Sequence, residues 1–236
     1  MKLAQPPTSF FQCSNPKCAL RIPAGRALQT DQLKCPRCHS PLLPVPTARD
    51  VSAALSQSSK KTSPAIQLEA LLDNIRSTFN VGAMFRTADG AGISHLYLSG
   101  LTPLPGNPRI SKTALGAEFA VPWEYAPNGY QLAQTLKADG KTLWALETTS
   151  TAVSLFEIQA LPQNQPLVLV VGNEVSGIDP SIMELCDQTI FIPMSGFKHS
   201  LNVAVAFGIA VYHLAFGLPA YLTDNRMGSK IQPQSS

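Results

Sequence analysis

The sequence of 236 residues is poor in charge and contains no long apolar run. Only 14% of the residues are Asp, Glu, Lys or Arg, while 44% are hydrophobic, so the chain can bury a core and is not disordered. The strongest apolar stretch, residues 167–171, has the length of a strand, not of a membrane span. The first residues lack the apolar core of a signal peptide. We therefore expect a cytoplasmic protein that has no membrane partner.

The signatures of several enzyme classes do not stand out either. We find no dinucleotide fingerprint Gly-x-Gly-x-x-Gly, no zinc-protease motif, and no Ser-His-Asp or paired-carboxylate arrangement. The glycine-containing loop at residues 172–177 is not a phosphate-binding P-loop, because no Gly-Lys-Ser/Thr follows it. These absences count against a nucleotide-binding enzyme of Rossmann type, which remains an alternative for an α/β chain.

Charge is unevenly distributed along the chain. Residues 1–64 carry nine Lys/Arg and two Asp/Glu, a net charge of +7, whereas residues 65–236 carry nine and thirteen, a net charge of −4. A basic front end suggests an anionic partner, most simply nucleic acid. The alternative is a solvated basic surface that keeps the protein in solution.

Four of the five cysteines lie in the first 38 residues, as the closely spaced pairs Cys13/Cys18 and Cys35/Cys38. Two tight turns that each deliver two thiolates are typical of structural zinc, and the alternative is free thiols. We expect a zinc-ribbon-like module at residues 1–43, which depends on metal because its core is small. Its basic residues favour RNA or DNA over protein as the partner: Lys17, Arg21, Arg26, Lys34 and Arg37.

The rest of the chain predicts a linker, one larger domain and a tail. Residues 44–64 are rich in Ser, Pro, Thr and Ala without apolar periodicity, and residues 217–236 have the composition of a flexible tail. Within residues 65–216 we expect strands at 66–72, 93–99, 142–146, 167–171 and 189–192, with helices at 130–138, at 180–185 and from 201. Alternating helices and continuously apolar strands indicate an α/β fold with a parallel sheet.

Ligands of open α/β sheets bind at the carboxyl ends of the strands, where three polar loops arrive. In the first loop, residues 73–90, Asn80 can cap the following helix, and Arg86 is either solvated or placed to meet phosphate or ribose. In the second, residues 171–177, Gly172 and Gly177 allow close approach to a ligand or a positive φ. Glu174 there can also serve as the partner of a helix dipole.

The third loop, residues 192–202, leads into a helix that is apolar almost all round. Ser200 is expected to be its N-cap. A helix without a polar face should be buried on all sides, within one subunit or between two. Lys198 and His199 can face an anionic ligand, although a surface loop is the alternative. Cys186 is interpreted as a core cysteine.

Together the loops resemble the three motifs of the SpoU/TrmH family of RNA ribose 2′-O-methyltransferases, in the SPOUT class. The first motif is NVGAMFRTADGAGI at residues 80–93, the second VVGNEVSGI at 170–178, and the third IPMSG and SLNVAVA within 192–206. Their order matches the family, and the resemblance covers essentially all of residues 65–216. Two departures are the zinc-ribbon-like module, where many relatives carry another extension, and Ala204, where a serine is common.

The resemblance implies a C-terminal trefoil knot that holds S-adenosylmethionine, and an obligate homodimer. It places the cofactor against Gly172, Ile192, Met194 and Leu201. It implies that Arg86 is the catalytic arginine for a ribose 2′-hydroxyl of tRNA or rRNA, and that no metal is needed at this step. The supporting polar residues would orient Arg86 and the nucleotide: Asn80, Glu174, Ser200 and Asn202. The alternative function is a catalytically inactive RNA-binding or ribosome-assembly factor of the same fold.

Overall fold

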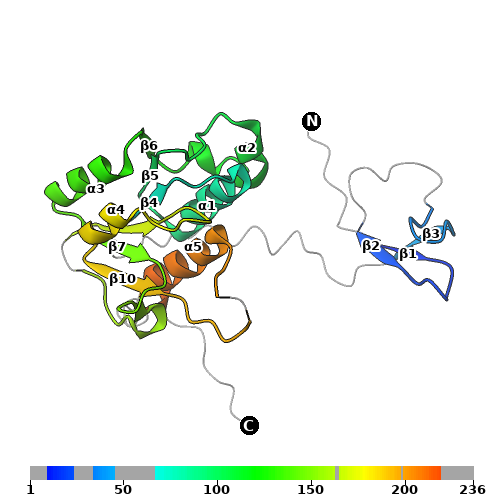
Figure 1. Cartoon of the computed structure of the whole chain (residues 1–236). Coiled ribbons are helices and arrows are strands. Elements are labelled where there is room, and N and C mark those ends of the chain that lie inside the picture. Colours follow the sequence, from blue (N-terminus) through cyan, green and yellow to red (C-terminus); the bar gives the residue numbers. More distant parts are fainter. Residues whose placement is uncertain (1–9, 24–33, 46–66, 163–164, 198, 219–236) are drawn as a thin grey trace, which may run out of the picture. The chain divides into compact units, whose positions relative to one another are not determined.

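The structure, a computed structural model, describes residues 10–23, 34–45, 67–162, 165–197 and 199–218. The chain divides into two compact units, residues 1–62 and residues 63–236, which are described separately (Figure 1). Apart from residues 44–45 and 217–218, the predicted linker and tail lie outside the described residues. Leu218, which was predicted to belong to the tail, is buried in the core of the second unit.

The first unit contains a small antiparallel sheet with the strand order β2-β1-β3. Its strands are β1 (Phe10–Cys13), β2 (Arg21–Pro23) and β3 (Leu42–Val45). Among its described residues, Cys13, Cys35 and Leu42 are the ones buried in its core. A core of this size gives little hydrophobic stabilisation, so the unit needs a further source of stability.

The second unit is built on a seven-stranded sheet in which every pair of neighbouring strands is parallel. The strand order is β6-β5-β4-β9-β7-β10-β8. The prediction of a parallel α/β sheet is confirmed. The bounds of the strands are β4 (Leu68–Asp73), β5 (His95–Ser99), β6 (Trp123–Ala126), β7 (Thr142–Leu146), β8 (Val153–Ser154), β9 (Leu167–Val171) and β10 (Gln188–Phe191).

Helices cover both faces of this sheet. Helices α1 (Thr78–Ala91), α2 (Pro108–Ala114) and α5 (Val203–Tyr212) share one hydrophobic core, while α3 (Gly129–Ala138) and α4 (Pro180–Leu185) pack into the other (Figure 1). Short 3₁₀ helices lie at Ala117–Phe119 and Leu155–Glu157, and a π-helical turn at His213–Gly217 follows α5. The sequence analysis missed α2 and β6, because seven and four residues are too short to display a periodicity.

Helix α1, which carries Asn80 and Arg86, is seated closely on α2. A Cβ at Gly82 would overlap the Thr113 side chain and the Ile110 carbonyl, so only glycine permits this distance between the two helices.

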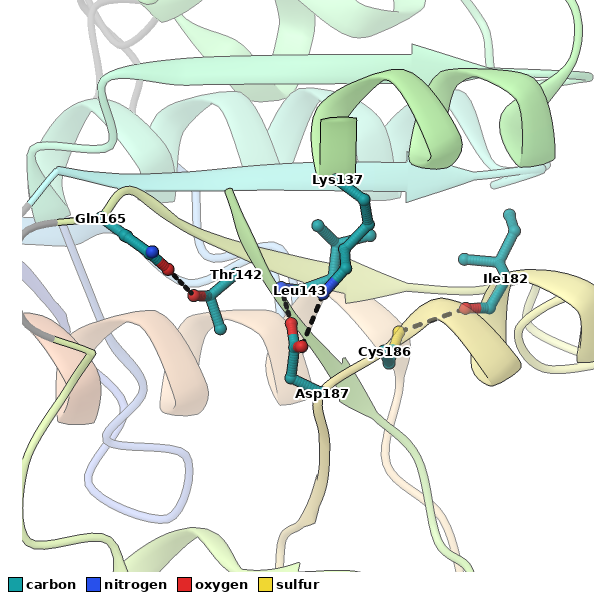
Figure 2. Close-up of polar contacts among 7 residues, drawn as sticks. All are labelled: Lys137, Thr142, Leu143, Gln165, Ile182, Cys186 and Asp187. Carbon is teal, nitrogen blue, oxygen red and sulfur yellow. Dashed lines mark hydrogen bonds and ion pairs between the residues drawn. The ribbon is translucent and has the colours of Figure 1, made fainter. Parts of the chain in front are cut away.

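The α3/α4 layer is tied to the sheet by a group of polar contacts (Figure 2). Lys137 of α3 forms an ion pair with Asp187, whose second carboxylate oxygen accepts the backbone N–H of Leu143 in β7 at 2.9 Å. The half-buried Cys186 thiol donates to the carbonyl of Ile182, and burial raises its pKa to about 12. This cysteine is therefore an unreactive packing residue, as predicted.

Helix α5 corrects one expectation and leaves a second one open. Its N-cap is Asn202, whose side-chain oxygen accepts from the backbone N–H groups of Ala204 and Val205. The prediction of Ser200 as the N-cap is wrong, because Ser200 lies two residues before the residue that caps the helix. The helix is also not buried all round within the chain. Phe207 is fully buried, but Val205 is 51% exposed and Tyr212 47% exposed. The trefoil knot stays a prediction.

No helix among the described residues combines the length and the apolar character that crossing a bilayer requires.

Candidate functional site

The carboxyl edge of the parallel sheet opens into a cavity of about 410 Å³, a volume typical of ligand sites. The cavity is lined by residues from the ends of β7, β9 and β10, from the loop before α5, and from the first turns of α5. Two of the three polar loops identified in the sequence thus line it directly. The remaining loop, which is the first along the chain and lies between β4 and α1, is joined to the other two by hydrogen bonds.

Glu174 forms the central junction between these loops. Its carboxylate accepts from the backbone N–H groups of Arg76 and Ser77 at 3.0 and 3.2 Å, at the start of α1. It also accepts from Asn80 Nδ2 at 2.9 Å. Burial opposes ionisation, but these donors outweigh it and hold the pKa of Glu174 below its usual range. A carboxylate at a helix N-terminus also interacts favourably with the helix dipole.

Asn80 links Glu174 to the last helix. The structure corrects its predicted role as a helix cap: the N-cap of α1 is Ser77, and Asn80 lies in the first turn, where its backbone N–H donates to the Ser77 side chain. The Asn80 side chain is therefore available for other partners. Its Oδ1 accepts from Asn202 Nδ2 at 3.1 Å. Three of the five residues implied as catalytic, Asn80, Glu174 and Asn202, thus form one continuous chain of hydrogen bonds.

The sequence analysis missed Asn173, which holds the loop that carries Glu174 in place. Its Nδ2 donates to the carbonyl of Asn74 at 2.8 Å, and its Oδ1 accepts from the backbone of Val175 and Ser176. Asn173 therefore shapes the loop that carries Glu174 and anchors it to the end of β4. The available signal was a polar side chain directly after the glycine that ends a buried strand.

Gly172 is required by the path of its own loop. A Cβ there would overlap the backbone of Gly177 and Ile178, closer than any side chain permits. Gly177 has a φ of +73°, which accords with the expected positive φ in this loop. The two glycines thus serve the tight fold of the loop, and Gly172 also lines the cavity.

The remaining predicted residues fall into two places. Ile192, Met194, Ser200 and Leu201 line the cavity, as Gly172 does. Arg86 does not line it; this residue is exposed on α1, near the middle of the helix. Within the described part of the chain its guanidinium has no hydrogen-bond or ion-pair partner. His199 also lines the cavity, whereas Lys198 lies outside the described residues.

The first unit gathers the four predicted ligands Cys13, Cys18, Cys35 and Cys38, whose sulfur atoms all lie within 4.8 Å of one another. Sulfur atoms around a tetrahedral zinc ion are about 3.8 Å apart, close to the 3.7 Å between Cys18 and Cys35. Hydrogen bonds from Ser40 lower the pKa of Cys38 to about 6, while burial raises that of Cys13 to about 12, so the sulfur positions and not the thiol pKa values carry the case for a metal. The donor set therefore fits structural zinc.

Comparison with known proteins identifies the family of the second unit. The model of the SpoU rRNA Methylase family matches residues 67–212. The chain belongs to this family. The match begins at the strand that leads into the first polar loop and ends with α5, so it includes all the residues of the hydrogen-bonded chain.

Curated relatives are about one third identical to this chain over the aligned residues. The 23S rRNA (guanosine(2553)-2′-O)-methyltransferase RlmP of Bacillus subtilis is 32% identical, over 71% of this chain and 65% of its own length. A tRNA (guanosine(18)-2′-O)-methyltransferase of Aquifex aeolicus is 34% identical, over 59% of this chain and 64% of its own length. The chain thus spans slightly less than two thirds of these relatives.

Solved SpoU structures share the fold. The AdoMet-bound rRNA methyltransferase from Sinorhizobium meliloti has a TM-score of 0.59 and 29% identity, and covers 65% of this chain and 57% of its own. The A. aeolicus TrmH/SpoU tRNA modifying enzyme has a TM-score of 0.56 and 32% identity, over 65% and 76%. The matched regions include the α/β architecture described above.

The close packing at Gly172 leads to a first prediction. We expect Gly172→Ala to destabilise the second unit by about 1–3 kcal/mol, because a backbone segment must move to admit the methyl group. Urea unfolding measures the loss. Gly196→Ala is the matched control, since a Cβ at Gly196 meets nothing within 4 Å. Equal stability of the two variants would contradict the packing argument.

The hydrogen bonds to Glu174 lead to a prediction about pH. Because the folded pKa lies below the usual value of 4.5, the carboxylate stabilises the fold fully above pH 4.5, and this contribution is lost as pH falls through the folded pKa. We expect Glu174→Gln to be less stable at neutral pH by under about 1 kcal/mol, since the group is exposed. The difference should shrink below pH 4.5 in denaturant titrations.

The control for this titration is Glu184→Gln, which changes an exposed carboxylate on α4. Its stability difference from the unchanged protein should stay small at every pH. A Glu174→Gln difference that grows on acidification would show that the sign is wrong.

Proposed function

We propose that this chain transfers a methyl group from S-adenosylmethionine to a ribose 2′-hydroxyl of a structured RNA, either tRNA or rRNA. The observation that carries the proposal is the hydrogen-bonded chain Glu174–Asn80–Asn202, at the rim of a ligand-sized cavity. The relatives named above are 2′-O-methyltransferases of rRNA and tRNA, and one of the similar structures is AdoMet-bound.

The cavity fits the proposed cofactor in size and in its mixed lining. When bound, S-adenosylmethionine would supply an electrophilic methyl group on a sulfonium. Gly172, Ile192 and Leu201 would hold it through their backbone groups, with Met194 beside them. Ser200 lies at the same rim and would orient the nucleotide. Because direct transfer needs the acceptor oxygen in line with the methyl group, most of the rate would come from positioning.

Arg86 would act on the acceptor side. A guanidinium stays charged and a ribose hydroxyl is a poor nucleophile, so Arg86 is better suited to stabilise the developing alkoxide than to remove its proton. Its lack of a partner among the described residues leaves its five N–H donors available to RNA. A phosphate of the substrate would complete its environment and assist it.

The first unit would bind zinc through its four cysteines and contact the RNA backbone. Its described residues include no Asp or Glu and four exposed basic side chains, those of Lys17, Arg21, Lys34 and Arg37. Lys17 and Arg37 each directly precede a proposed zinc ligand, so the metal would hold both at the surface of one rigid module. Contacts of this kind neutralise phosphates and make binding salt-dependent.

We also propose a homodimer. The side of α5 that bears Val205 and Tyr212 is apolar and exposed in the single chain, and a second subunit would cover it. The knot implied by the family and a cytoplasmic location, where tRNA and rRNA are modified, complete the proposal. The division into a module, a linker, a catalytic domain and a tail is proposed with it, except that β3 extends the module to Val45 and the buried Leu218 extends the domain to residue 218.

The alternative is an inactive RNA-binding or assembly factor of the same fold. The exposed Arg86, which has no partner among the described residues, favours the enzyme, because a factor that had lost activity would not need an available guanidinium there. The deciding measurement is transfer of labelled methyl from S-adenosylmethionine to separate tRNA and rRNA pools that lack native modification. Label that protects one position from alkaline cleavage would establish 2′-O-methylation.

Substitution of Arg86 tests its role in this assay. We expect Arg86→Ala to lower turnover by at least about a hundredfold, because a charged donor for the developing alkoxide is removed. Cofactor binding, measured by calorimetry, and the oligomeric state, measured by light scattering, should not change. Arg86→Lys keeps the charge but not the planar fork, and we expect only partial recovery. A fully active Arg86→Ala variant would refute the assignment.

Substitutions in the first unit test its contact with RNA separately. We expect the double variant Lys17→Ala/Arg37→Ala to bind RNA more weakly. A plot of the logarithm of the RNA association constant against the logarithm of the salt concentration should become less steep by about two, one for each lost phosphate contact. Cys35→Ser/Cys38→Ser should release zinc and weaken RNA binding while cofactor binding persists.

The matched control is Gln12→Ala/Ser14→Ala, which alters exposed uncharged residues of the same unit. This variant should keep both its zinc content and its salt slope. RNA affinity that is unchanged in the basic and cysteine variants would show that the module has another partner.

A further inference from the structure

Glu147 is a carboxylate of the cavity that neither the motifs nor the comparisons single out. It directly follows β7 and lines the cavity beside Leu146 and Thr148. Its side chain is half-buried. Oε1 accepts the backbone N–H of Thr148 at 2.9 Å, and Oε2 lies against Gly177, where a Cβ would come within 2.7 Å of it. In the described part of the chain, Glu147 has no ion-pair partner.

The charges around the cavity make this carboxylate unusual. The lining contains two carboxylates, Glu147 and Glu174, and its described residues include no Lys or Arg. Both oxygens of Glu174 are engaged by N–H donors of the β4–α1 loop and Asn80. No donor in the described part of the chain reaches Glu147 Oε2, and His199 is the only other titratable group among the described lining residues, so Glu147 adds a negative charge that no described cation balances. A cavity of this kind favours a cationic ligand over a neutral one.

We propose that Glu147 determines cofactor specificity by pairing with the positively charged part of the methyl donor. This inference rests on the proposed function, because it places S-adenosylmethionine in the cavity. S-adenosylmethionine carries a sulfonium and an ammonium group, whereas the product S-adenosylhomocysteine keeps only the ammonium group. 5′-Methylthioadenosine has the same nucleoside but neither cation.

A competing role for a carboxylate is to accept hydrogen bonds from ribose hydroxyls. All three ligands contain that ribose, so a ribose contact would affect their binding alike. A charge contact would affect only the ligands that carry the cation. The comparison of the three ligands therefore separates the two roles without any measurement of turnover.

The test is calorimetric binding of each ligand to the full chain and to Glu147→Gln, which keeps the shape and the acceptor oxygen but loses the charge. We expect S-adenosylmethionine to bind roughly tenfold more weakly to the variant, as for the loss of one partly solvated ion pair. Binding of 5′-methylthioadenosine should change by less than about twofold. If S-adenosylhomocysteine is weakened as well, the paired cation is the ammonium group; if not, it is the sulfonium.

The matched control is Glu157→Gln, which removes an exposed carboxylate that does not line the cavity and should leave all three affinities unchanged. Unchanged binding of S-adenosylmethionine to Glu147→Gln, or equal weakening of all three ligands, would overturn the inference while the proposed function stands. If the unchanged protein binds none of the three ligands, the proposed function fails and the inference fails with it.

Discussion

The arrangement of the site depends on one carboxylate at the start of one helix. Glu174 comes from the loop after β9, yet it satisfies N–H groups at the entrance of α1. Those donors have no partner within the helix, so leaving them unpaired would be costly. The same contact brings together loops that are about a hundred residues apart in the chain. Asn80 then extends the connection to Asn202, whose other atoms cap α5.

Elements with a strong pattern could be predicted from the sequence. Continuous apolar runs predicted β7 and β9, and the helix expected at residues 180–185 is α4, all three with the bounds that the structure shows. α2 and β6 could not be predicted, because their position is set by packing against α1 and β5 and not by periodicity. For helix α5 the pattern is strong but its meaning is incomplete. Its apolar composition indicates burial, but it does not say whether the same chain or a second subunit packs against the helix.

The residues of the site could be found from the sequence, but their local roles could not. Asn80 and Ser200 both look like helix caps because each precedes an apolar run. The structure assigns those caps to Ser77 and Asn202 instead. A shift of two or three residues of this kind changes the contacts of a side chain, since it leaves the Asn80 side chain to donate to Glu174. Asn173 and Glu147 were missed because their importance comes from neighbours that are distant in sequence.

The two carboxylates of the cavity illustrate how the same chemical group acquires two roles. Both oxygens of Glu174 accept hydrogen bonds and the group acts as a structural anion, whereas no donor among the described residues reaches Oε2 of Glu147, which also lines the cavity. A site with that charge suits a cationic cofactor but repels a polyanion such as RNA. Residues 65–236 carry a net charge of −4, so the second unit gains no general attraction for RNA from its charge. Under the proposed function, the attraction would come from local cations, namely Arg86 on α1 and the basic residues of the first unit, and this would give a physical reason for joining a positively charged cysteine module to this fold.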